Sequence, residues 1–324
     1  KLSSLHSAAE YNFESTELEY SNDINEEAFK IISAFYNIYK AENTNKIIEE
    51  NLKSLEAHIK DSKNFLANDL IIKNDLLKIE VQYSSVQLKK VEAENGLEIA
   101  KALFNKTIGN EISDEVNIKT DKISLSIDSY DFNTLLNEAK NNRLELESIS
   151  KKVLAGKEQV SASNSGWYPS VFLFSDFYYS RPNQRYFPIK DQFDDSWDVG
   201  VTLSWDIWNW DYNSSQTQQA ENNLVQLETA KSQLEDGIEI EVYNSYLNLQ
   251  SAIKKVNLTK LTLEQAEENY RITNDKYLVQ LASSTDLLDA ESSLYSAKVD
   301  VLNSLVDYEL AKIKLDKSVG KKLY

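Results

Sequence analysis

The stretch WDVGVTLSWDIWNWDYNSSQ, residues 197–216, changes character halfway, and this change decides the fold. In residues 197–207 apolar side chains alternate with small or acidic ones, the two-residue period of a β-strand. Beyond Ser214 the chain is polar and runs to Tyr324 without a proline. The stretch therefore predicts a strand that is followed by long helices.

A second strand is expected just before this stretch. All five Trp and all three Pro lie between residues 167 and 210, and WYPSVFLFSDFYYS (167–180) is rich in strand-forming residues. With the polar stretch RPNQRYFPIKDQFDD (181–195) between them, the two runs predict an antiparallel hairpin with a long loop. Each strand has about 11 to 14 residues, enough to cross a bilayer. The facing of the first strand stays open, because Phe172, Phe174 and Tyr178 share a face with Asp176.

The second strand has one apolar face. Such a face fits either a half-buried sheet or the wall of a membrane barrel. Its members are Trp197, Val199, Val201, Leu203, Trp205 and Ile207.

The rest of the chain has the apolar periodicity of amphipathic helices. From Leu224 to Val256, apolar residues recur at spacings of three, four and seven, which predicts one helix from Ser214 to Tyr277. It would be about 60 residues and about 90 Å long, and its apolar seam needs helical neighbours. Further helices are expected at 284–319, 5–66, 73–107 and 130–163.

An internal repeat relates the two halves. FYNIY (35–39) matches VYNSY (242–246), and LIIKNDLLKIE (70–80) matches LASSTDLLDAE (281–291). The second match also relates Gly109 to Gly320. Two copies of a long helical hairpin are therefore expected. A hairpin equivalent to residues 167–210 would precede residue 1, so we expect the chain to be N-terminally incomplete.

Composition excludes several function classes. Seven Gly and three Pro in 324 residues indicate few turns, and a net charge of −17 argues against a nucleic-acid partner. There is no Cys, and the two His, His6 and His58, are interpreted as solvated residues on helix surfaces. We expect no metal, no cofactor and no catalytic activity. No apolar run reaches the length of about 18 residues that a transmembrane helix needs.

VGVTLSWDIWN, GWYPSVFLF and the run from Lys276 to Gly320 resemble the TolC-like outer membrane efflux proteins, and the resemblance covers essentially the whole chain. It implies a mainly α fold with a membrane β-hairpin, in which long antiparallel helical hairpins form a tunnel. It also implies a homotrimer with one shared twelve-stranded barrel. The expected parts are a first helical hairpin (1–109), a connecting segment (110–128), an ascending helix (129–166), the membrane hairpin (167–210) and a second helical hairpin (211–324).

The resemblance implies an exit duct in the outer membrane with a large periplasmic part. It would serve a tripartite efflux pump or a type I secretion system and work with a periplasmic adaptor and an inner-membrane pump. A non-channel periplasmic coiled-coil scaffold is the alternative, and a hydrolase that uses scattered carboxylates is a weaker one.

The resemblance also assigns site residues. Tyr277, Asp286 and Asp289 match a gating tyrosine and a ring of inward-facing aspartates, although a solvated surface pair also accounts for the two aspartates. The expected adaptor-contacting tip comprises Asn68, Asp69, Leu70, Val279, Gln280 and Leu281. Where the family usually has a glycine in the tip turn, this chain has Asp69 and Gln280. The expected lipid-facing band and aromatic girdle comprise Trp197, Val199, Val201, Leu203, Trp205, Trp208 and Trp210.

Overall fold

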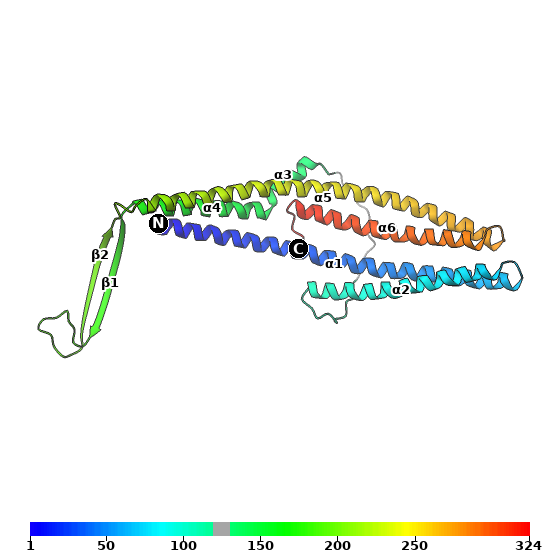
Figure 1. The fold of residues 1–324 in the computed structure, drawn as a ribbon, viewed down its shortest axis with the longest axis horizontal. Helices are drawn as coiled ribbons and strands as arrows, with labels where there is room; N and C mark the ends of the chain where they lie inside the picture. Colours follow the sequence, from blue (N-terminus) through cyan, green and yellow to red (C-terminus); the bar gives the residue numbers. More distant parts are fainter. Residues whose placement is uncertain (119–129) are drawn as a thin grey trace. The chain divides into compact units, whose positions relative to one another are not determined.

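A computed structural model describes residues 1–118 and 130–324, and Figure 1 shows their long helices and one hairpin. The predicted fold class is confirmed: most of the described chain is helical, with a two-stranded antiparallel sheet. Residues 119–128 of the expected connecting segment, and the first residue of the expected ascending helix (129), lie outside the described residues. The elements are α1 (Leu2–Ala67), α2 (Lys73–Thr107), α3 (Phe132–Asn142), α4 (Leu144–Asn164), the 3-10 turn η1 (Ser165–Trp167), β1 (Ser170–Ser180), β2 (Asp194–Ser204), α5 (Tyr212–Leu278) and α6 (Ser284–Ser318).

The chain divides into two compact units. Unit 1 contains residues 1–19 and 145–234, and unit 2 contains residues 20–144 and 235–324. None of the helices in the two described ranges has a stretch both long and apolar enough to span a membrane.

The two long helical hairpins predicted from the repeat are present. α1 has 66 residues and α2 has 35, while α5 has 67 and α6 has 35. In unit 2 the predicted seam residues Ile238, Val242, Leu249 and Val256 of α5 are buried. The first hairpin contributes a core cluster of Ile48, Leu52, Leu55, Ile79 and Val86.

The helix predicted at 130–163 is wrong in one respect, because it is broken. α3 ends at Asn142, and Arg143 takes an extended conformation with ψ 116° before α4 begins. Contacts within unit 2 explain the break, since the Arg143 guanidinium donates to the Ser318 carbonyl (3.1 Å) and pairs with Glu241 (2.9 Å). The backbone at Asn142 also lies so close to Gly320 that a Cβ there would be 2.7 Å away. Tertiary contacts thus override local helix propensity.

The register of the hairpin in unit 1 settles how β1 faces. β1 and β2 pair residue for residue, so that Phe177 lies opposite Trp197, and Asp176 lies opposite Asp198. Directly opposed residues share a face. Val171, Leu173 and Phe177 therefore join the apolar face of β2, and Phe172, Phe174, Asp176 and Tyr178 lie on the other face.

Two details of the hairpin differ from the sequence expectation. β2 ends at Ser204, so Trp205 and Ile207 follow the strand instead of extending it. Gly200 lies under the ring of Phe174, where a Cβ would be 2.5 Å from the ring. The glycine therefore makes room for a large aromatic ring on a face that otherwise carries small and acidic groups in β2.

Candidate functional site at the tip of unit 2

Two turns close the helical hairpins at one end of unit 2 (Figure 1). The turn after α1 has Asp69 at φ 57°, and the turn after α5 has Gln280 at φ 62°. Each helix ends with two backbone hydrogen bonds: Leu70 N–H to Phe65 and Asp69 N–H to Leu66 after α1, and the equivalent Leu281 and Gln280 bonds after α5. This is the Schellman arrangement, which normally has glycine at the left-handed position. The two turns are thus built alike on residues that are not glycine.

The predicted tip residues lie at these turns. Leu281 is 78 % exposed, and Leu70 and Val279 are also more than half exposed. Asn68 is tied down by its side-chain amide, which donates to the Asn64 carbonyl at 2.7 Å. The turns therefore expose apolar side chains on a hydrogen-bonded backbone.

Asp286 is held in a capping box at the start of α6. Its carboxylate accepts from the Ser283 N–H (2.9 Å) and hydroxyl (2.7 Å), and its own N–H donates back to the Ser283 hydroxyl (3.1 Å). These bonds lower the pKa of Asp286 below its ordinary value. Asp289 lies one turn further on and is exposed. Both carboxylates stand on the same side of α6.

The equivalent start of α2 is built differently. Ile72 occupies the N-cap without a side-chain hydrogen bond to the helix. Asp75, equivalent to Asp286, lies 3.6 Å from the Lys78 ammonium. Lys78 stands where the second repeat has Asp289, and it also donates to Thr285 of α6 at 3.3 Å.

Tyr277 is buried between helices, with 2 % of its surface exposed. Its hydroxyl shares a hydrogen bond of 2.7 Å with Ser62, and its ring meets His58 and Phe65 edge to face. Burial raises the pKa of Tyr277 above its ordinary value, so the hydroxyl stays protonated. Tyr277 therefore holds α5 against α1.

The interpretation of His58 as a solvated residue is wrong. It is 3 % exposed, and its Nδ1 lies 3.2 Å from Glu291 Oε2, while its Nε2 lies 3.3 Å from the Ser284 hydroxyl. Glu291 and Ser284 are themselves 5 % and 4 % exposed. A carboxylate can only accept, so Nδ1 donates to it. His58 occupies an apolar-seam position of α1, three residues after Leu55, because its polar partners lie across the seam on α6.

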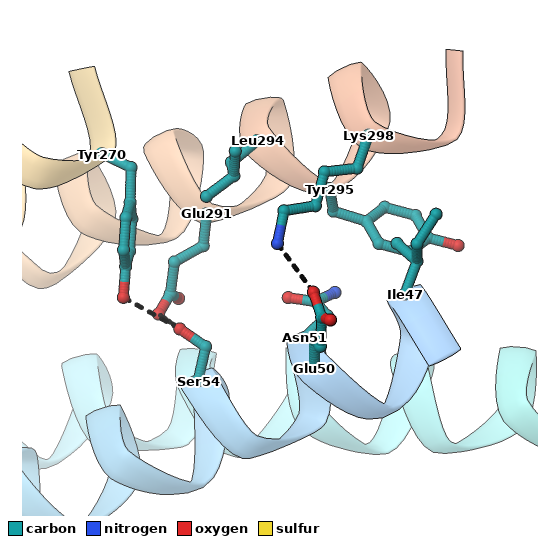
Figure 2. A pocket seen from close by; sticks show the side chains of 9 residues that line it. All are labelled: Ile47, Glu50, Asn51, Ser54, Tyr270, Glu291, Leu294, Tyr295 and Lys298. Carbon is teal, nitrogen blue, oxygen red and sulfur yellow. Dashed lines mark hydrogen bonds and ion pairs between the residues drawn. The ribbon is translucent and has the colours of Figure 1, made fainter. Parts of the chain in front are cut away.

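A small cavity of about 130 Å³ opens beside this pair (Figure 2). Ser54 donates to Glu291 Oε1 at 3.1 Å and shares a hydrogen bond of 3.0 Å with the Tyr270 hydroxyl. On the other side of the cavity the Lys298 ammonium donates to Glu50 at 2.8 Å. Glu291 of α6 is thus linked to α1 and, through Ser54, to Tyr270 of α5 by a polar network that is partly buried. No group of three potential metal-ligating side chains occurs in the parts of the chain that the structure describes.

Comparison with known proteins identifies the architecture. A model described as outer membrane efflux protein matches residues 135–321, more than half of the chain. The chain belongs to the outer membrane efflux protein family. It is 25 % identical over 305 residues to the outer membrane protein TolC of Escherichia coli (strain K12), a match that covers 89 % of this chain. The chain spans 60 % of the length of that relative.

Solved structures agree with this family assignment. A structure of CusC, described in connection with folding and transmembrane channel formation, superposes with a TM-score of 0.85 at 16 % identity. It is covered to 74 %, and 99 % of this chain is matched. The open state of the MtrE outer membrane channel of Neisseria gonorrhoeae gives a TM-score of 0.81 at 16 % identity, covering all of this chain and 72 % of the other. These likenesses establish the fold.

The hairpin of this family member exposes the residues predicted to face lipid. Trp197, Val199, Val201 and Leu203 are all exposed, and from residue 196 to residue 200 the exposed residues alternate with less exposed neighbours. The following residues Trp205, Trp208 and Trp210 are also exposed, and the Trp208 and Trp210 rings meet edge to face at 6.0 Å. Trp205 donates from its indole N–H to the Trp167 carbonyl at 3.3 Å, which fixes it at the foot of the hairpin.

The long loop of the hairpin folds against the opposite face. Asn183 is buried and donates to the Asp194 carbonyl and the Ser196 hydroxyl. Arg185 pairs with Asp198 at 3.2 Å and stacks on the Tyr178 ring at 3.9 Å. These contacts were not predicted from the sequence, in which the only signal for them is an arginine in a polar loop, a residue that favours a carboxylate partner.

Proposed function

We propose that the chain forms part of an outer membrane channel-tunnel, an exit duct for a tripartite efflux pump or a type I secretion system. The single observation that carries the proposal is the hairpin of unit 1, one face of which is apolar and exposed along both strands. Membership of the outer membrane efflux protein family supports it. The region 167–210 is assigned to the outer membrane, and the helical hairpins 1–109 and 211–324 to the periplasm.

The exposed face of the hairpin suits contact with lipid. Val171, Leu173 and Phe177 of β1 stand beside Leu203, Val201 and Trp197 of β2. A large apolar face that is exposed to water is unfavourable. We therefore assign lipid to this side of the hairpin and water to the side of Asp176 and Asp198. Trp205, Trp208 and Trp210 follow β2, where the girdle of a membrane strand is expected.

The outer helices of unit 2 each carry an unpartnered apolar stripe. Figure 1 shows α5 and α2 on the two outer sides of unit 2, with α6 and α1 between them. Two different stripes on one chain favour a head-to-tail interface, which closes into a ring. We assign the ring to the homotrimer that is characteristic of the family. The stripe on α2 comprises Leu77, Val81, Leu88, Val91, Ile99 and Leu103, and the stripe on α5 comprises Ile240, Leu247, Leu258, Leu261 and Ile272.

The tip of unit 2 is assigned to gating and to partner contact. In the trimer, Asp286 and Asp289 from three chains would place six carboxylates around one opening, which attracts cations and repels anions. The capping box keeps Asp286 ionised to lower pH, which supports this role. Asn68, Asp69, Leu70, Val279, Gln280 and Leu281 are assigned to the periplasmic adaptor. Tyr277 is assigned an indirect role, in which its buried side chain holds α5 in place against α1.

We assign no catalytic role to the chain. Ser284, His58 and Glu291 follow the order of a hydrolase triad, with the imidazole between hydroxyl and carboxylate. Ser284 is nevertheless 4 % exposed and is not among the residues that line the cavity beside Glu291. We therefore assign a structural role to this buried trio. We assign the energy source for export separately, to an inner-membrane partner.

The test is the behaviour of the full-length protein. It should require detergent for extraction, migrate as a trimer and give cation-selective conductance in planar bilayers. Asp289→Asn should reduce the cation preference. Asp300→Asn is the matched control, because Asp300 is exposed on the same face of α6 but lies about three helical turns further from the tip. A water-soluble monomer without conductance would instead support the periplasmic scaffold.

A further inference from the structure

The imidazole of His58 bridges two points of α6 that are seven residues apart. Ser284 and Glu291 lie two helical turns apart on one face of the helix. Asp286 and Asp289 lie between them, on the opposite face. A single side chain of α1 therefore holds both ends of the segment that carries these two carboxylates.

Other contacts to the same segment fix how the start of α6 is rotated about its own axis. Ser54 of α1 donates to the second oxygen of Glu291, and Lys78 of α2 donates to Thr285. Leu288 packs against the core cluster of the first hairpin. Each of these contacts links the start of α6 to the first hairpin, and together they set its rotation about its own axis.

Polar groups in an apolar seam cost stability unless they are fully paired, but they specify register. A slip of α6 along α1 would separate Glu291 and Ser284 from the imidazole and leave buried polar groups unpaired. An apolar seam residue at position 58 would tolerate such a slip. The buried trio thus selects one axial and rotational position of α6.

We propose that His58 is a positioning residue for the opening at the tip, and that it acts through Ser284 and Glu291 to aim the Asp286 and Asp289 carboxylates. The proposal rests on the channel function assigned above. It gives the first repeat a defined task in gating, because α1 fixes the helix of the second repeat that carries the carboxylates.

The experiment uses full-length trimer with His58→Leu/Glu291→Leu, which removes both buried polar partners together and so avoids an unpaired buried charge. His58→Gln is the conservative variant, since its amide can donate to Glu291 and reach Ser284. Thr259→Val/Ser304→Ala is the control, because it removes a partly buried hydrogen bond of 2.8 Å between α5 and α6 away from the tip. Planar-bilayer selectivity and the distance between spin labels at positions 69 and 280 are measured for each.

We expect the double leucine variant to remain trimeric, to lose cation preference and to broaden the distance distribution between the labels. His58→Gln should retain both wild-type properties, and the control should match the wild type. Wild-type selectivity and label distances in the double leucine variant would overturn the proposal. If the wild-type protein gives no conductance, the channel assignment fails, while the label distances still test the positioning by His58.

Discussion

Asp69 and Gln280 adopt the same left-handed backbone conformation at equivalent turns of the two repeats, with φ 57° and 62°. Neither residue is glycine, and an L-residue pays about 1–2 kcal/mol in this region, although Asp tolerates it better than Gln. The chain therefore keeps two strained turns at the end where partner contact is proposed.

Gln280→Gly should raise the midpoint of thermal unfolding of the trimer, because it relieves strain of about 1 kcal/mol. Asp69→Gly should give a smaller gain, since Asp takes this conformation at lower cost. Gln280→Ala is the control and should give no gain. If both glycine variants raised the midpoint equally, Gln280 would not be more strained than Asp69, which would contradict the prediction.

Gly320→Ala should destabilise the protein more than Gly109→Ala. Both glycines have positive φ, 81° and 84°, at the ends of α6 and α2, so both substitutions cost about 1 kcal/mol in backbone strain. Only at Gly320 would the new Cβ meet backbone, 2.7 Å from the Asn142 carbonyl carbon. Thermal unfolding of the two variants should differ by this additional clash, and equal melting temperatures would argue against the close approach.

Ser283→Ala should raise the pKa of Asp286 toward its ordinary value, because Ser283 supplies the hydrogen bonds that lower it. A lowered folded-state pKa stabilises the fold above the unfolded pKa, and this contribution is lost as pH falls through the folded value. Loss of the cap itself should cost about 1 kcal/mol. Unfolding followed from neutral to acidic pH should show the variant losing less stability than the wild type on acidification.

Val201→Arg should prevent stable insertion of the hairpin, since a cation on a lipid-facing strand costs about 2–4 kcal/mol at mid-membrane. Thr202→Arg is the matched control on the neighbouring residue, which lies on the opposite face of β2. Membrane fractionation and trimer stability in detergent distinguish the two variants. If both variants lost membrane insertion and trimer stability to a similar extent, the assignment of lipid to the Val201 face alone would be wrong.

Most of the helices were predictable from the sequence because the seam repeats so regularly. The paired residues 70–80 and 281–291, and Gly109 and Gly320, also marked where the hairpins turn and end. The break at Arg143 was not predictable, since it depends on the Ser318 carbonyl and Glu241, which are far away in the chain. Local patterns carry no information about such contacts.

The buried role of His58 escaped the sequence analysis for a related reason. A polar residue at a seam position can point to solvent or across the seam, and only the register of α1 against α6 decides which. The orientation of Glu291 was equally ambiguous, because α6 carries many charged residues and a glutamate in such a helix usually points to solvent. The facing of β1 likewise required the pairing of Phe177 with Trp197.

The unequal N-caps of α2 and α6 have a consequence for assembly. Ile72 and Ser283 are repeat equivalents, and so are Lys78 and Asp289, which differ in sign of charge. A ring of three duplicated chains has six hairpin ends, and with identical repeats each would offer the same surface. In the proposed ring, anionic ends that carry Asp286 and Asp289 would alternate with ends where Lys78 pairs with Asp75, so that the rim would have threefold chemical symmetry. A docking partner could then distinguish the gap within a chain from the gap between two chains.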